Sequence, residues 1–428
     1  MASVFLCFMF FTLFLHSSYS ISSKNLFLPL KLQHLPSGSV QKPPNKLSFH
    51  HNVTLTVSLS VGSPPQQVTV VLDTGSELSW LRCKKTPTAP LWFDPLRSKS
   101  YSPVPCSSPT CRARTRDFII PVSCDPKKLC HAILSYADFT SVEGNLAYDT
   151  FRFTNSDLPG IVFGCMDTGS SSVEEEDSKV TGLLGMNRGS LSFVSQMGYK
   201  KFSYCISGRD STGVLLFGDT EVSWVGPLSY TALVKMTTPL PSYDRVAYTV
   251  QLEGIKVGGT VLPLPKSVYV PDHTGAGQTM VDSGTQYTFL LGPVYNALKN
   301  EYLKQTKSML RVYEDTKFAF QGVLDLCFLI DRKRVGLPLL PSVTIMFRGA
   351  QMSVSGERLL VQVPGLIKGN DQIHCFTFGN SELLGVESYI IGHHHQQNMW
   401  MEFDLANSRV GLAEFRCDLA SQKLGMGL

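Results

Sequence analysis

Charge and helical patterning are both scarce in this chain of 428 residues. Asp, Glu, Lys and Arg together make up 17% of it, and the formal net charge is only +4. So small a balance over this length gives no broad basic surface, which argues against nucleic acid as a partner. Helical periodicity is nearly confined to Pro293–Leu310, whereas short alternating segments are frequent. The pattern therefore predicts an all-β protein with minor helices.

Several catalytic motifs are also missing. The chain has no Gly-x-Ser-x-Gly elbow of the kind that carries a nucleophilic serine. Its Gly258-Gly259 pair does not open a helix, as a phosphate-binding loop would. No Cys-x-x-Cys unit pairs with a second such unit, so a zinc site is not expected. We therefore expect neither a metal nor a cofactor.

Long apolar runs are limited to the N-terminus. Val4–Leu15 is too short to span a bilayer and is followed by small residues, which is typical of a cleaved secretory signal over residues 1–20. A signal anchor is the alternative. Residues 21–50 have no sustained period and are interpreted as a short propeptide or an unpaired N-terminal arm. Asn52 begins a glycosylation sequon. We expect a protein of the secretory pathway that is not inserted in a membrane once the signal is removed.

What the chain does contain is a repeat. Val70–Leu81 runs an apolar strand into Asp73, a small hydroxyl residue, a glycine and a second hydroxyl residue, and Thr279–Leu290 does the same around Asp282. An apolar pair that ends in glycine follows each turn, 112 and 110 residues after the two aspartates. Two ordinary turns are the alternative, because Asp-Thr-Gly and Asp-Ser-Gly are good turn sequences. Turn chemistry does not explain the matched second element.

The length agrees with this duplication. A chain of 428 residues exceeds the size at which one hydrophobic core keeps growing, so two lobes are expected. We predict an N-terminal β lobe over residues 51–230, a C-terminal β lobe over residues 231–417 and a short tail over residues 418–428. Each lobe then presents one carboxylate on a tight turn.

The two turns resemble those of the pepsin-like aspartic proteases. The resemblance extends from about residue 50 to Cys417, and the plant nepenthesin-like branch fits best. Further motifs that carry it are Val61–Gln66, Phe93–Pro95, Val104–Cys106, Phe163–Cys165, Gly182–Met186, Phe202–Cys205, Val257–Gly259 and Arg409–Ala413. It implies a bilobal pepsin-like fold of two pseudo-twofold-related β lobes with a central cleft. It also implies a monomeric aspartic endopeptidase, active at acidic pH on polypeptide substrates.

The resemblance identifies the two aspartates as the catalytic pair. Two carboxylates a few ångströms apart cannot both ionise comfortably, so they share one proton and can serve together as acid and base. On this interpretation Asp73 and Asp282 hold the nucleophilic water between them. The sequence does not indicate which of them is the base in the resting enzyme.

Four neighbours of the aspartates are expected to support them. Gly75 and Gly284 let the backbone approach closely, so that its N–H groups can contact the carboxylates. The hydroxyls of Ser76 and Thr285 can bond the outer carboxylate oxygens and orient both acids. Simple turn hydroxyls are the alternative for these two side chains.

A lid over the reacting groups is expected, because bulk water would weaken their electrostatics. Tyr136 aligns with the tyrosine of the family's flap, and Trp80 is its expected partner beneath. Both of the usual flap glycines are replaced here, by Ala137 and Phe139. The alternative for Tyr136 is an ordinary core tyrosine.

The cysteines suit an oxidising compartment. Eleven are present, and removal of Cys7 with the signal would leave an even number. Spacing alone does not fix the pairing, although Cys106 with Cys111 and Cys124 with Cys130 are close enough to close small loops. The family's pattern implies the remaining bonds, which are Cys83–Cys165, Cys205–Cys417 and Cys327–Cys375.

The run His393–His395 invites a metal hypothesis. Successive side chains on an extended segment point to opposite faces, so three adjacent histidines cannot converge on one ion without distortion. A structural or surface role is therefore expected, with a contribution of His393 to the pH response of the cleft as the alternative.

Two other functions compete with proteolysis. A binding or inhibitor protein on the same scaffold is the first, but plant members of that kind have typically lost part of the aspartate pair. A glycosidase with two carboxylates is the second, and its acids need no duplicated turn. The intact pair favours the endopeptidase.

Overall fold

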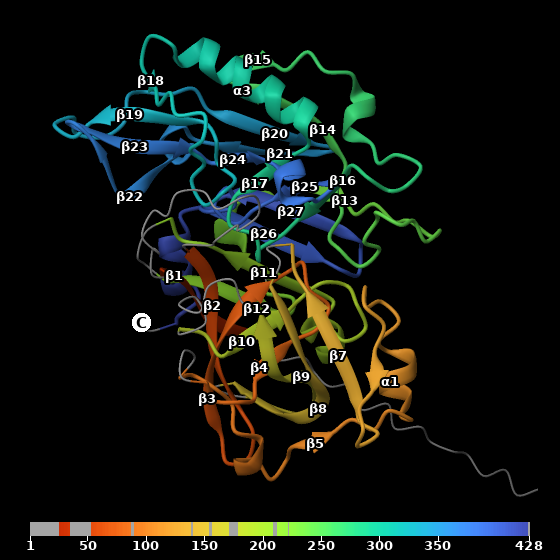
Figure 1. Cartoon of the computed structure of the whole chain (residues 1–428). Helices are drawn as coiled ribbons and strands as arrows, with labels where there is room; N and C mark the ends of the chain where they lie inside the picture. The colour runs from red at the N-terminus through yellow and green to blue at the C-terminus, as the bar shows by residue number, and fades with distance from the viewer. Residues whose placement is uncertain are drawn as a thin grey trace, which may run out of the picture.

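The computed structural model of the chain describes residues 25–34, 53–86, 90–137, 140–153, 156–170, 179–208, 212–220 and 222–426. The expected signal over residues 1–20 and the sequon at Asn52 lie outside these residues. The described residues form mostly β-strands with a few short helices, which confirms the predicted all-β class (Figure 1).

One sheet of 15 strands runs through the molecule, in the order β13-β27-β26-β11-β12-β1-β2-β3-β10-β4-β9-β8-β7-β6, with β5 paired to β8. Its strands are β1 (Leu26–His34), β2 (Val53–Val61), β3 (Gln66–Asp73), β4 (Trp80–Arg82), β5 (Ser102–Pro103), β6 (Ser123–Cys124), β7 (Cys130–Ser135), β8 (Ser141–Phe153), β9 (Ser156–Ser170), β10 (Gly182–Gly185), β11 (Lys201–Cys205), β12 (Gly213–Phe217), β13 (Ser229–Ala232), β26 (Met399–Asp404) and β27 (Arg409–Glu414).

Three four-stranded sheets lie in the C-terminal half, in the orders β15-β14-β20-β21, β16-β25-β17-β24 and β18-β19-β23-β22. Their strands are β14 (Leu252–Val257), β15 (Thr260–Val261), β16 (Gln278–Val281), β17 (Thr288–Leu290), β18 (Arg311–Val312), β19 (Cys327–Asp331), β20 (Val343–Phe347), β21 (Ala350–Val354), β22 (Leu360–Lys368), β23 (Asp371–Phe376), β24 (Phe378–Asn380) and β25 (Ser388–Ile391). The α-helices of the described residues are α1 (Pro109–Ala113), α2 (Phe193–Met197), α3 (Gly292–Thr306) and α4 (Ala420–Lys423).

The sequence repeat is also a repeat of topology. In the first half β3 runs parallel to β10, β10 is antiparallel to β4, and β4 is parallel to β9. In the second half β16 runs parallel to β25, β25 is antiparallel to β17, and β17 is parallel to β24. Gly185 and Gly392 permit this packing, because an added Cβ would lie 2.7 Å from the Leu78 carbonyl oxygen in the first case and 2.0 Å from the Tyr287 carbonyl oxygen in the second. Each half therefore ends a strand at an aspartate in the same way.

The two lobes are connected by one part of the 15-stranded sheet, the strands β13-β27-β26-β11-β12-β1, which lies between them in Figure 1. This part is called the joining sheet below. Strand β11 pairs with β26, so that Lys201–Cys205 lies opposite Trp400–Asp404. The rings of Phe202 and Phe403 stack across this pair with their centroids 4.6 Å apart, and both side chains are fully buried. Burial of one such side chain contributes about 1.5–3 kcal/mol to stability.

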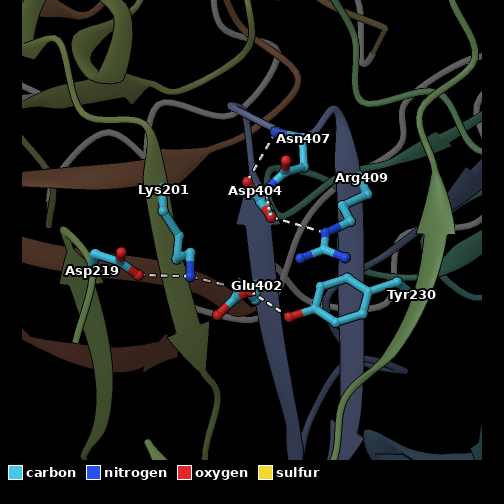
Figure 2. Close-up of polar contacts among 7 residues, drawn as sticks. All are labelled: Lys201, Asp219, Tyr230, Glu402, Asp404, Asn407 and Arg409. Carbon is cyan, nitrogen blue, oxygen red and sulfur yellow. Dashed lines mark hydrogen bonds and ion pairs between the residues drawn. The ribbon is translucent and has the colours of Figure 1, made fainter. Parts of the chain in front are cut away.

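One face of this joining sheet carries two buried carboxylates from β26, Glu402 and Asp404, and both are paired (Figure 2). The Lys201 ammonium lies 2.8 Å from the carboxylate of Asp219 and 3.7 Å from that of Glu402. The Tyr230 hydroxyl donates a second contact to Glu402 at 2.8 Å. Because a buried charge without a partner is strongly destabilising, these contacts are needed to keep Glu402 in the sheet.

The second carboxylate, Asp404, is held from β27 and the turn before it (Figure 2). Arg409 donates to it through Nε at 2.8 Å while its guanidinium covers the Tyr230 ring, 3.7 Å from the centroid. The Asn407 amide donates to the same oxygen at 2.8 Å. Burial acts to raise the pKa of Asp404, but these hydrogen bonds outweigh it and hold the pKa below its ordinary value.

The disulfide bonds confirm three expected pairs and correct two. Cys83–Cys165, Cys205–Cys417 and Cys327–Cys375 are present as the resemblance implied. The expectation that sequence neighbours pair was wrong, because the bonds are Cys106–Cys124 and Cys111–Cys130. Cys124 and Cys130 lie directly opposite each other on the β6–β7 hairpin. The segment around α1 lies against this hairpin, and one of its two cysteines bonds to each strand.

The one long helical pattern forms the helix that its spacing predicts. Helix α3 buries Val294, Leu298 and Tyr302 on a single face, and Leu303 is partly buried beside them. Among the described residues, no helix is both long enough and apolar enough to cross a membrane.

The N-terminal segment differs from the expected unpaired arm. Leu26–Leu30 pairs with β12 and the rest of β1 pairs with β2, so β1 is an inner strand that connects the joining sheet to the N-terminal lobe. The alternating residues Leu26, Leu28 and Leu30 are 7%, 3% and 2% exposed. This alternation is a half-buried strand pattern, and its partner strand β12 lies almost 200 residues later in the chain.

The position of β1 predicts that its removal destabilises the protein. A chain that begins at residue 21 is expected to fold, whereas one that begins at residue 35 exposes the edges of β2 and β12 and loses three buried leucines. Each lost leucine costs about 2–5 kcal/mol. Thermal unfolding of the two secreted chains tests this, with Leu28→Ala as a milder variant. Equal midpoints would mean that β1 is not part of the stable body.

Candidate active site

The two aspartates occupy equivalent places at the ends of strands. Asp73 is the last residue of β3 and lies opposite Gly185 of β10, and its carbonyl accepts a hydrogen bond from the N–H of Met186 at 2.8 Å. Asp282 follows β16 directly, and its N–H donates to the carbonyl of Ile391, at the end of β25, at 3.1 Å. The neighbouring strand of the same lobe thus fixes the backbone of each aspartate. The side chain remains available for contacts with the other lobe.

Each carboxylate receives the same two local donors. The N–H of Gly75 donates to Asp73 Oδ1 at 2.7 Å, and the N–H of Gly284 donates to Asp282 Oδ1 at 2.9 Å. The outer oxygens accept hydroxyl donors, from Ser76 to Asp73 Oδ2 and from Thr285 to Asp282 Oδ2. The structure therefore places all four predicted neighbours in contact with the predicted aspartates. Bonds of this kind to a charged acceptor are stronger than neutral ones.

Glycine is required in both turns because each turn lies against the carboxylate of the other lobe. An added Cβ on Gly284 would lie 2.3 Å from Asp73 Oδ1, and one on Gly75 would lie 3.0 Å from Asp282 Oδ1. The two carboxyl groups also make a direct side-chain hydrogen bond to each other. Asp73 is only 6% exposed. Two acids that are 209 residues apart in sequence thus form one pair, of which Asp73 is buried and Asp282 is partly exposed.

Burial and like charge together perturb this pair. Burial is the largest influence and raises the pKa of Asp73 well above its ordinary value, and the negative charge of Asp282 raises it further. The hydrogen bonds from Ser76 and Gly75 act in the opposite direction. Because the raising effects win, Asp73 retains a proton at pH values where an exposed aspartate has lost it.

The middle residues of the two turns lock the lobes together. The N–H of Thr74 donates to Ser283 Oγ at 3.0 Å, and the N–H of Ser283 donates to Thr74 Oγ1 at 2.9 Å. Each hydroxyl then donates to a carbonyl of the opposite strand, Thr74 to Val281 at 3.2 Å and Ser283 to Leu72 at 2.9 Å. Both side chains are almost completely buried. The sequence showed them only as small hydroxyl residues within the repeat and did not indicate that they bond to each other.

A second support was not anticipated from the sequence. The side-chain amide of Gln396 donates to the carbonyls of Asp282 at 3.2 Å and Ile391 at 2.7 Å. Its oxygen accepts the hydroxyl of Tyr204, which lies on β11 of the joining sheet. Both side chains are fully buried. Gln396 therefore ties the Asp282 turn to the sheet between the lobes, and nothing in its local sequence distinguished it from an ordinary core glutamine.

The predicted flap pair is present. Trp80 Nε1 donates to the Tyr136 hydroxyl at 2.6 Å, from β4 to the end of β7. Burial is the main cause of the strongly raised pKa of Tyr136, and the charge of Asp73 adds to it. The Tyr136 hydroxyl therefore carries its proton at acidic and neutral pH. Of the two replaced flap glycines, the Phe139 position lies outside the described residues.

In the run His393–His395 the first and last side chains are buried and His394 is half-buried, which fits the structural role among the expected alternatives of a structural or a surface role. The N–H of His393 donates to the carbonyl of Thr285 at 2.8 Å, next to the Asp282 turn. Burial lowers the pKa of His394 to about 4. Among the described residues, no group of three or more His, Cys, Asp or Glu side chains is arranged to hold a metal ion.

The cross-lobe bonds give a direct prediction. Ser283→Ala removes one hydroxyl donor and leaves the buried N–H of Thr74 without its acceptor, which should cost about 1–3 kcal/mol for the unsatisfied group. Because the two carboxylates are placed by these turns, kcat should fall as well. Denaturant unfolding and peptide hydrolysis measure the two effects. Ser355→Ala, at an exposed serine, is the matched control and should change neither. Wild-type stability in Ser283→Ala would contradict the locking role.

Comparison with known families gives two matches that together cover most of the chain. A family described as xylanase inhibitor N-terminal matches residues 55–219, and one described as xylanase inhibitor C-terminal matches residues 247–414. The boundary between the two matches falls between the aspartate turns, so each contains one of them.

Comparison with curated proteins finds several aspartic proteinases. Aspartic proteinase PCS1 of Arabidopsis thaliana is 62% identical over 409 residues, which cover 94% of this chain and 90% of that protein. Aspartyl protease family protein 2 of Arabidopsis thaliana is 32% identical over 90% of this chain and 77% of its own length. Aspartic proteinase nepenthesin-1 of Nepenthes gracilis is 30% identical over 84% of this chain and 77% of its own length.

Solved structures share the fold at lower sequence similarity. The crystal structure of edgp has a TM-score of 0.66 at 20% identity and covers 93% of this chain and 96% of its own. Basic 7S globulin from soybean has a TM-score of 0.64 at 21% identity, over 91% of this chain and 96% of its own.

Proposed function

The chain belongs to the plant pepsin-like aspartic proteases of the nepenthesin-like branch, and from this membership we propose that Asp73 and Asp282 hydrolyse peptide bonds through one shared water. The protein is an aspartic endopeptidase. The observation that supports the proposed site is the close carboxyl pair, in which each acid has the same backbone and hydroxyl donors. Aspartic proteases are themselves the standard example of two carboxyls that share a proton.

In the proposed mechanism one carboxylate of the pair accepts a proton from the water while the other, protonated, acid donates to the carbonyl oxygen of the substrate. The water oxygen then bonds to the carbonyl carbon and forms a tetrahedral intermediate. As the carbon–nitrogen bond breaks, the amine nitrogen takes the proton that the first carboxylate received from the water, and a hydroxyl of the intermediate returns its proton to the other carboxylate, which restores the pair to its starting state. The proposed substrate is a polypeptide. The proposed reaction uses the two carboxyl groups and one water, without a metal or a cofactor.

Tyr136 is proposed to cover the substrate side of this pair. Its hydroxyl bond to Trp80 fixes the ring near Asp73, and its raised pKa keeps it neutral. A neutral aromatic ring can exclude water without adding a third charge to the two acids.

We also propose a secreted or vacuolar location and a monomeric state. The five disulfide bonds of the described chain support an oxidising compartment, such as the endoplasmic reticulum lumen followed by the apoplast or the vacuole. The small net charge argues against nucleic acid as a partner.

A binding or inhibitor protein is the second candidate, and the family descriptions favour it because both refer to xylanase inhibitors. That role does not require a buried pair of acids. The complete set of donors around both carboxyls, together with the Tyr136 contact, supports the endopeptidase over this alternative.

The proposal predicts proteolysis that depends on both acids. The secreted protein should digest an unfolded protein at about pH 4–5, as expected where a carboxyl pair shares one proton, and a statine-type transition-state mimic should block it. Asp282→Asn should lower kcat by a factor on the order of 10²–10⁴ or more, because it removes one partner of the acid–base pair. Casein digestion and fluorogenic peptides measure this.

Asp73→Asn is the companion variant, and it separates catalysis from folding. A carboxyl whose folded pKa is raised adds stability below its unfolded pKa of about 4 and loses it as the pH rises through the folded value. Asp73→Asn should therefore be inactive and yet more stable than the wild type at neutral pH. An intact, folded wild type that is inert from pH 3 to 7 would favour the binding-protein alternative.

The hydroxyl of Ser76 predicts a shift of the pH profile. Its hydrogen bond lowers the pKa of Asp73, so Ser76→Ala should raise that pKa further. Activity is lost when the pair gives up its shared proton, and the alkaline limb of kcat should therefore move to higher pH in the variant. A profile measured from pH 3 to 8 checks the direction. A limb that moves to lower pH would exclude Asp73 as the group that controls it.

A further inference from the structure

The first half of one surface loop is exposed and carries a run of cations. The loop connects β19 to β20 over residues 332–342 and has no regular secondary structure. Arg332, Lys333 and Arg334 are all exposed, and Val335 beside them is 101% exposed. An apolar residue with no packing contact at the tip of a loop contributes nothing to the core. Residues 332–336 are therefore not held in place by burial, whereas Leu340 anchors the second half of the loop in the core.

Few interactions hold the three cations in place. Their backbone N–H groups bond to a carbonyl or carboxylate oxygen, Arg332 to Asn370 at 3.1 Å, Lys333 to Asp331 Oδ1 at 2.9 Å and Arg334 to Asp331 at 3.0 Å. Within the described part of the chain, none of the three side chains takes part in an ion pair or a hydrogen bond. The cationic groups are thus free to enter the acidic subsites of another protein.

Two disulfides connect the chain across this loop. Cys327 precedes the loop on β19 and Cys375 follows it on β23, and they are bonded to each other at directly opposed positions of the two strands. Cys205–Cys417 spans the same loop from further away. A break in the loop would therefore leave two polypeptides that remain covalently joined.

We propose that the Arg334–Val335 bond is a processing site for an endoprotease that selects consecutive basic residues, and that the protein then exists as a disulfide-linked two-chain enzyme. Exposed loop tips are the preferred sites of proteolytic nicking. The reaction is a hydrolysis: the bond between the Arg334 carbonyl carbon and the Val335 nitrogen breaks. Water supplies the hydroxyl of the new carboxyl group and the proton of the new amine.

Two of the other basic pairs of the chain are less suited to such a protease, and the exposed pair Lys84-Lys85 serves as a control below. Lys201, of the pair Lys200-Lys201, lies within β11 and is paired with β26. The pair Lys127-Lys128 lies among the five residues between Cys124 and Cys130, where two disulfides anchor a tight hairpin. A protease needs a segment that can extend along its own site, and the 332–342 loop has the required length.

Cleavage at this loop should leave catalysis intact. Both aspartates lie in the part of the chain before Val335, so the pair stays on one polypeptide. The 94-residue second chain keeps its place through β26, which pairs with β11, and through both disulfides. The inference does not depend on the proposed proteolytic activity, because a different protease makes the cut.

The test is to secrete the full chain from plant cells and analyse it by mass spectrometry with and without reduction. The wild type should be one species before reduction and two after it, with the smaller beginning at Val335. The variant Arg332→Gln, Lys333→Gln, Arg334→Gln should remain one species in both conditions. Its kcat/KM should equal that of the wild type.

Two controls make the outcome decisive. Lys84→Gln, Lys85→Gln removes two exposed lysines elsewhere and should leave the cut unchanged. The cut should also persist in Asp282→Asn, because it is made by another enzyme, and its loss there would identify self-cleavage and overturn the proposal. A wild type that stays a single polypeptide after reduction, or a cut that survives the triple substitution, would also overturn it.

Discussion

Two carboxyl groups of like sign are held in contact inside this protein, and the surrounding structure has to compensate for their repulsion. Each acid receives a backbone N–H and a hydroxyl, and the two side chains are within hydrogen-bonding reach of each other. The pKa of Asp73 is still raised, because the hydrogen bonds from Ser76 and Gly75 only partly offset the effects of burial and of the negative charge of Asp282. At neutral pH the burial and like charge of the pair make it energetically unfavourable. The pair persists because favourable interactions elsewhere in the fold outweigh this cost.

The compensation comes from contacts that cross between the lobes. The reciprocal bonds of Thr74 and Ser283 fix the two turns relative to each other, and Gly75 and Gly284 allow the approach to be close enough for the acids to meet. Gln396 extends this support to the joining sheet. The two carboxyl groups are therefore positioned by buried, hydrogen-bonded side chains near the ends of strands. Such rigid support is what a catalytic site needs to keep its geometry.

The features that could be predicted are those that depend on residues close together in the sequence. Asp73 and Asp282 stand in a duplicated turn, and the spacing of α3 shows on which face it packs. The pairing of Cys106 and Cys111 was wrong because it depends on how the α1 segment meets a hairpin further along the chain. The alternation of Leu26, Leu28 and Leu30 was overlooked, and it does not by itself reveal that the partner strand of β1 is β12, which is remote in sequence.

The joining sheet also has a consequence for the order in which the protein can fold. Strand β11 stands near residue 200, but its neighbour β26 and the cysteine that bonds Cys205 come from the last thirty residues. During synthesis one edge of β11 and the thiol of Cys205 therefore remain without their partners until almost the whole chain has been made. Throughout that time this edge and this thiol are open to chaperones and to wrong disulfide partners.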